Sequence, residues 1–144
     1  MKKLISILLL CVATMTQAYA DDMSARAAAV MKVMPRPDLQ LMSVPSADGF
    51  IANKMMLASL RAGTDSNAVN DIVALLQGAA PASLAVTGKN DSITLATLDS
   101  AFDKLKGKTV APQELAYVNH DAADAALIAK AAEVGVKLVV VAYP

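Results

Sequence analysis

Most of the side chains in this sequence that could do chemistry lie in three short polar segments, at 46–48, 88–92 and 119–121. Each follows an apolar run with the length of a β-strand, and helices are expected to begin just after them. Carboxylate, imidazole, amide and ammonium groups gathered in one place could bind a small ligand, and a histidine among them could act as a general acid or base. The candidate ligand-binding residues are Lys89, Asn90, Asp91, Asn119, His120 and Asp121.

The same residue types also have a structural explanation. Asp48, Asp91, Ser92 and Asp121 stand where helices should begin, and Asp and Ser are preferred N-cap residues. His120 is the only histidine, and one histidine without cysteine partners falls short of the three or four ligands of a zinc site. Capping is the favoured explanation, and a ligand site is the alternative.

Motifs for nucleotide or acyl chemistry are incomplete in this sequence. The segment 86–90 is comparable with a phosphate-binding loop, but it lacks the first glycine, and Asn90 stands where Ser or Thr should hold magnesium. Neither a G-x-G-x-x-G fingerprint nor a G-x-S-x-G elbow is present. We therefore predict no catalytic residue, no metal site and no cofactor.

Methionines offer one further chemical alternative. Met31 and Met34 are about one helical turn apart, and paired thioethers could bind a soft metal such as copper or silver. Both also belong to an apolar helical stripe with Ala27 and Val30, which favours packing.

Hydrophobic periodicity predicts the elements that would position these residues. Uninterrupted apolar strands are typical of a parallel sheet that is buried on both faces. We predict an α/β fold: a small doubly wound, mainly parallel four-stranded sheet with helices on both faces, in the order α-β-α-α-β-α-β-α-β. By analogy with flavodoxin-like sheets, the predicted strand order is 2-1-3-4. The expected strands are 39–44, 84–87, 115–118 and 138–142.

The N-terminus has the three-part pattern of a secretory signal peptide. A basic start, Met1-Lys2-Lys3, precedes an apolar run, and Ala18-Tyr19-Ala20 places small residues at −3 and −1 of a cleavage site. The apolar run is shorter than the roughly 20 residues that a membrane anchor needs. The predicted division is a signal peptide at 1–20, a helix with a proline linker at 21–37, and a single α/β domain at 38–144.

Cleavage would leave a weakly acidic chain without cysteine. Cys11, the only cysteine, would be removed, and taking Lys2 and Lys3 from the 13 basic residues leaves 11 against 13 acidic residues, a net charge of about −2. This charge argues against non-specific nucleic-acid binding, and no second apolar segment is long enough to span a membrane. The expected location is the periplasm, with an extracellular location as the alternative.

A surplus of apolar surface gives the positive indication of function. The 50–61 helix and the last strand are strongly apolar, and this strand, if it lies at a sheet edge, would offer unpaired backbone groups to a partner strand. An envelope protein or a second copy of the chain could bury the surplus. We predict an exported, non-catalytic binding or interaction protein of the bacterial cell envelope. The alternatives are a small-ligand receptor or enzyme that uses the strand ends, and a methionine-based metal binder.

Overall fold

The computed structural model describes residues 22–78, 83–120 and 124–143. The predicted signal peptide and Asp121 lie outside these ranges. Within them, an N-terminal helix (described over 22–33) precedes four strands and four further helices, in the order predicted from the sequence.

The sheet is parallel throughout, and its strands lie side by side in the order of the sequence. β1 (Gln40–Val44), β2 (Leu84–Gly88), β3 (Gln113–Asn119) and β4 (Val136–Ala142) each pair with the next. The predicted α/β class with a parallel four-stranded sheet is confirmed, but the predicted strand order 2-1-3-4 is wrong. The polar residues of β1 explain the difference, because a central strand buried on both faces would be apolar throughout.

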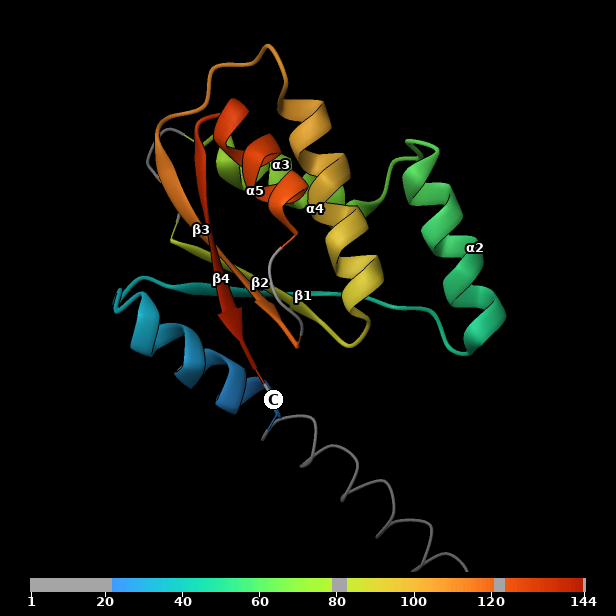
Figure 1. Cartoon of the computed structure of the whole chain (residues 1–144), viewed down its shortest axis with the longest axis horizontal. Coiled ribbons are helices and arrows are strands. Elements are labelled where there is room, and N and C mark those ends of the chain that lie inside the picture. Colours follow the sequence, from blue (N-terminus) through green and yellow to red (C-terminus); the bar gives the residue numbers. More distant parts are fainter. Residues whose placement is uncertain (1–21, 79–82, 121–123, 144) are drawn as a thin grey trace, which may run out of the picture.

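Three connections place their helices on one face of the sheet (Figure 1). Right-handed crossovers between successive neighbouring strands put every connecting helix on the same side. The main core lies between these helices and the sheet, and it includes Phe102, Leu115 and Tyr117. The helices are α2 (Phe50–Arg61), α3 (Asn67–Leu76), α4 (Asp91–Leu105) and α5 (Ala125–Glu133).

The N-terminal helix covers the opposite face of the sheet (Figure 1). Val30 of this helix and Met34, just after it, are buried in one cluster with Ala116, Val118 and Val141. Helices therefore lie on both faces, as predicted, but the second face is covered by a helix that comes before the sheet.

Met31, in the N-terminal helix, and Met34, just after it, lie in different surroundings. Met34 is buried in the core that this helix forms with the sheet, whereas Met31 is exposed. Their thioethers therefore do not share one exposed surface. Packing accounts for Met34, as the apolar stripe predicts.

Helix capping uses different residues from those expected. Asn90, not Asp91, caps α4 through a 3.1 Å hydrogen bond that its Oδ1 accepts from the Ile93 amide. Asp124 caps α5, and α2 begins after Gly49 without a side-chain cap, so Asp48 is not a capping residue. The sequence located the starts of the helices to within a few residues, and the caps depend on backbone angles at single positions.

Lys130 of α5 joins its helix to α4 through two ion pairs. Its Nζ lies 2.6 Å from Asp99 Oδ1 and 3.1 Å from Asp103 Oδ2. Partial burial, the largest single influence, acts to raise the pKa of Asp103, but hydrogen bonds and charges of Lys130 and Lys106 outweigh it, and the net pKa is lowered.

We expect the Lys130 ion pairs to contribute stability at neutral pH that is lost in acid. A carboxyl with a lowered folded-state pKa contributes fully above its unfolded-state pKa, near 4, and loses this contribution as pH falls through the folded-state pKa. Urea unfolding between about pH 5 and about pH 2 should show a shallower loss of stability for Lys130→Met than for the natural chain. Lys108→Met, which changes an exposed lysine outside the network, is the control. Equal pH dependence in both variants would contradict this account.

Candidate functional site

Five of the predicted site residues lie within the described ranges, at the carboxyl edge of the sheet where β2 and β3 end; Asp121 lies outside these ranges. A parallel sheet brings its carboxyl ends to one edge whatever the strand order, so this part of the prediction needs only the parallel sheet. A binding crevice usually forms at such an edge where the strand order reverses, and this sheet has no reversal. The edge therefore gathers the described residues without the reversal of strand order that usually opens a crevice.

His120 and Asp91 are brought together at this edge. The imidazole Nδ1 lies 2.9 Å from Asp91 Oδ2, and the backbone amide of His120 donates to the same oxygen at 3.4 Å. An imidazole held through Nδ1 has Nε2 left as a second polar atom, and the ring is partly exposed. Asp91, which supplies the carboxylate, lies in the first turn of α4.

The other described candidate residues differ in their surroundings. Asn90 is the helix cap described above, and Lys89 is exposed at the end of β2. Asn119 is only 4% exposed, and its Oδ1 and the Oδ1 of Asp91 are buried with no hydrogen-bond partner among the described residues. Buried oxygens of this kind are usually paired, so these two acceptors could receive a donor group from a water molecule or a ligand.

Arg26 lies at the same edge of the sheet, but it is not among the site residues predicted from the sequence. The residue is 5% exposed, and its Nη1 donates to Thr87 Oγ1 at 2.6 Å and to the Gly88 carbonyl at 3.3 Å. Its Nε donates to Asp22 Oδ2 at 2.9 Å. A usable signal was present, because Arg26 lies four residues before the core residue Val30 and so shares its helix face.

Tyr143 connects the arginine to the histidine. Its ring lies 4.7 Å from the Arg26 guanidinium carbon and meets the His120 ring edge-on, with centroids 6.0 Å apart. A hydrogen bond to Asp22, together with burial and the Asp22 charge, raises the pKa of Tyr143. We call the set Asp22, Arg26, Thr87 and Tyr143 the arginine lock, because it fastens the N-terminal helix to the ends of β2 and β4.

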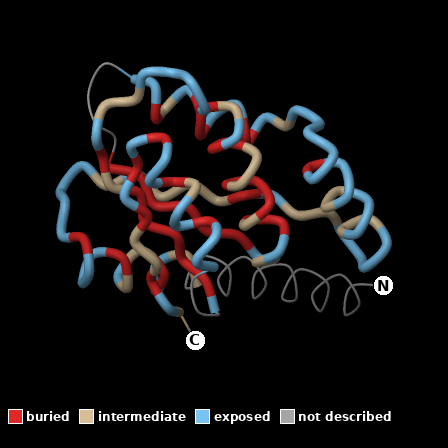
Figure 2. Tube along the Cα trace, turned by 45° about the horizontal axis from the view of Figure 1, so that its top comes forward, coloured by how far each residue is buried: buried red, intermediate tan, exposed pale blue. Residues whose placement is uncertain are grey.

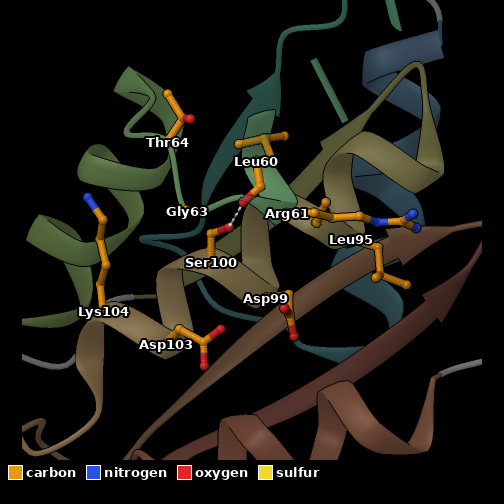
Figure 3. A pocket seen from close by; sticks show the side chains of 10 residues that line it. Leu60, Arg61, Gly63, Thr64, Leu95, Asp99, Ser100, Asp103 and Lys104 are labelled. Carbon is orange, nitrogen blue, oxygen red and sulfur yellow. Dashed lines mark hydrogen bonds between the residues drawn. The ribbon is translucent and has the colours of Figure 1, made fainter. Parts of the chain in front are cut away.

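A hollow of about 280 Å³ lies away from this edge, between α4 and the turn that follows α2. Figure 3 shows the Ser100 hydroxyl beside the Leu60 carbonyl, with Asp99 and Asp103 on α4. Both carboxylates are already paired with Lys130. The hollow is lined by residues of α2, α4 and the turn after α2, and by none of the predicted site residues.

The outer face of α2 carries the three most exposed large apolar side chains of the described residues. Phe50, Ile51 and Met55 are 72%, 74% and 67% exposed, although Phe50 is one of only two phenylalanines in the chain. Figure 2 shows α2 exposed along most of its length. Together with exposed Ala58, these residues form what we call the α2 outer face.

The opposite side of α2 is apolar as well. Leu60 is buried, and Met56 and Leu57 pack against the core beside α4. Ile51, Met55 and Ala58 repeat at i, i+4 and i+7, which is the spacing of a seam that packs against another helix. A helix that is apolar on both sides normally has both sides covered.

Comparison with known proteins assigns no family to this chain. No family model, no curated protein and no solved structure matches it. In the part of the chain that the structure describes, no cluster of three or more His, Cys, Asp or Glu could hold a metal ion. No helix within the described ranges is both long and apolar enough to cross a bilayer.

Proposed function

We propose that this protein is an exported, non-catalytic binding protein of the bacterial cell envelope, and that it docks on another protein through the α2 outer face. The observation that carries this proposal is the exposure of Phe50, Ile51 and Met55 on a helix whose other side is already packed. Burying three large apolar side chains is favourable by about 1.5–3 kcal/mol each before the costs of association are subtracted.

Charges beside the α2 outer face indicate the chemistry of the partner. Lys54 lies over the Phe50 ring, 4.3 Å from its centroid, and the exposed Arg61 ends the helix. An apolar helix or groove with acidic residues at its margin would complement this surface. Asp48 lines the same surface hollow as Phe50 and Met55, so the margin of the face carries charges of both signs. A protein surface can match such a mixture group by group, whereas anionic lipid can match only the cations. A protein partner is therefore favoured over a membrane surface.

The compartment in this proposal rests on the sequence. A basic start, a short apolar run and the Ala18-Tyr19-Ala20 pattern support export to the periplasm. An exposed apolar helix on an exported protein supports a role in assembly or attachment within the envelope.

Binding should depend on Ile51, the most exposed side chain of the α2 outer face. We expect Ile51→Glu to weaken binding to the natural partner about 30-fold, because a carboxylate within an apolar contact costs about 2 kcal/mol. The partner is first sought among periplasmic proteins that the tagged natural chain retains and Ile51→Glu does not. It is then purified, and both affinities are measured by titration calorimetry.

Ala126→Glu is the matched control, since it places the same charge on an exposed position of α5. It should bind as tightly as the natural chain. If Ile51→Glu and Ala126→Glu bind a purified partner equally, the α2 outer face is not the docking surface. Sedimentation with vesicles of anionic phospholipid tests the other occupant, and retention abolished by Ile51→Glu would assign the surface to a membrane.

A small-ligand receptor is the second candidate, and the pairing of His120 with Asp91 favours it. The imidazole and the two unpaired oxygens of Asp91 and Asn119 could bind a small molecule that carries hydrogen-bond donors. A thermal-shift screen of small amines, amino acids and sugars would test this, with Asn119→Ala as the comparison. A compound that raises the melting temperature of the natural chain but not of Asn119→Ala would support a receptor, and equal shifts would count against it.

A further inference from the structure

The outer edge of β4 is a second surface with unused binding capacity, separate from α2. β4 is the last strand of the sheet and pairs only with β3. In Figure 1, β4 is drawn in front of β3 and β2. The sequence left open whether this apolar strand is central, and the structure places it at an edge.

Two hydrogen bonds show which backbone groups of β4 face outward. The Gly135 carbonyl accepts from the Gln113 amide at 3.4 Å, and the Tyr143 amide donates to the Asn119 carbonyl at 2.9 Å. Because alternate residues of a parallel strand bond to the same neighbour, the odd-numbered residues bond to β3. The even-numbered residues turn their N–H and C=O groups outward, and no other described segment bonds to them. These residues are Val136, Leu138, Val140 and Ala142. Val136 is 1% exposed and is already covered, Leu138 is 8% exposed, and Val140 and Ala142 are the more accessible residues, so the open part of the edge runs from Leu138 to Ala142.

The helix above this edge presents an uncharged side. Lys130 points to α4, where it pairs with Asp99. Ile128 lies about 200° around the helix from Lys130 and therefore faces away from α4, toward the β4 edge. Its side chain is 38% exposed, and Ala132, on the same side, is exposed as well. We call the outward backbone of β4 with Ile128 and Ala132 the β4 edge surface.

We propose that two copies of this chain pair through the β4 edge surface, with their β4 strands antiparallel across a two-fold axis, so that two four-stranded sheets become one. Long apolar edge strands with few charges readily pair with another strand. Lys137 is the only charged residue of β4, and its ammonium pairs with Glu114 at 2.9 Å. A two-fold axis at Val139 sets Lys137 opposite Val141 of the other copy, so like charges do not meet.

A second copy fits this edge better in this arrangement than through pairing of β4 with β1. Pairing β4 with β1 of another copy would be head-to-tail and would continue into a filament, whereas antiparallel β4 pairing closes as a dimer. β1 has five residues, two of them polar (Gln40 and Ser43), and β4 has seven, of which only Lys137 is polar. The inference is independent of the proposed function, because it uses no residue of α2.

Size-exclusion chromatography with light scattering on the purified exported protein tests the proposal from about 1 µM to about 1 mM. We expect a dimer whose dissociation constant rises at least about tenfold in Ile128→Glu and in Val140→Pro, which removes one outward N–H group. Ala126→Glu, on the other side of α5, should leave the dimer unchanged. Far-UV circular dichroism and a cooperative melt establish that each variant is folded.

Amide hydrogen exchange gives a second test, because it measures whether the outward amides of β4 are protected by pairing with another chain. The outward amides of Leu138 and Val140 should be protected at dimer concentrations and exchange faster on dilution, while the amide of Val139, bonded to β3, should stay protected. A monomer throughout the concentration range would overturn the proposal. So would assemblies that grow beyond a dimer, or a dimer that Ile51→Glu dissociates and Ile128→Glu does not.

Discussion

Arg26→Met is expected to lower the free energy of unfolding by about 3 kcal/mol, one of the two largest effects that we predict. The substitution leaves the Thr87 hydroxyl without its partner and separates Asp22 from the only cation bonded to it in the described chain. Breaking a buried ion pair costs about 3–5 kcal/mol, and the lower end applies because Asp22 is about a third exposed. Methionine retains most of the apolar stem, but the contact of the guanidinium with the Tyr143 ring is lost as well.

Urea unfolding of Arg26→Met and of Arg36→Met measures this effect. Arg36 makes an exposed ion pair with Glu114, so its replacement should change stability by about 0.5 kcal/mol or less. Amide exchange should also show the N-terminal helix opening in Arg26→Met while the core strand β3 remains protected. Equal stabilities of the two variants would show that the arginine lock does not hold the helix.

Gly88→Ala is expected to cost about 2–3 kcal/mol, as overpacking of a tight contact does. The backbone at Gly88 has ordinary angles, but an added Cβ would overlap Thr94 Oγ1 and lie 3.1 Å from the Val44 carbonyl oxygen. Thr94 is held in place by a 2.9 Å hydrogen bond from its hydroxyl to the Asn90 carbonyl. Gly88 therefore lets the first turn of α4 approach the ends of β1 and β2, and with it Asp91.

A double-mutant cycle with Thr94→Ala separates this contact from a general intolerance of side chains at position 88. The paired variant should be more stable than the sum of the single costs predicts, by about 1 kcal/mol, because the overlapping hydroxyl is gone. Urea unfolding of the four proteins gives this coupling. Strictly additive costs would mean that Thr94 does not limit the space at Gly88.

The sequence was sufficient for the fold class, because continuous apolar strands alternating with periodic helices leave few arrangements. It was insufficient for strand order, which depends on how strand edges meet rather than on any one strand. Gln40 and Ser43 in β1 were the available signal that this strand is peripheral.

The candidate site was predictable in part for the same reason. Parallel strands bring Asn90 and Asn119 to one edge in any order, but the contact between Asp91 and His120 joins residues 29 apart and needs the final position of α4. The arginine lock depends on a helix that covers the far face, and the crossover pattern does not predict such a helix. The exposure of Phe50 and Ile51 could not be predicted, because composition does not tell which side of an apolar helix faces the core.

The central claim is that the α2 outer face is covered by another protein in the cell envelope. Site-specific photocrosslinking in intact cells tests it most directly, with a photoreactive amino acid in place of Ile51 or, as the control, of Ala126. We expect a discrete adduct with one periplasmic or membrane-attached protein from position 51 and none from position 126. The same adducts from both positions, or no protein adduct from position 51, would contradict it.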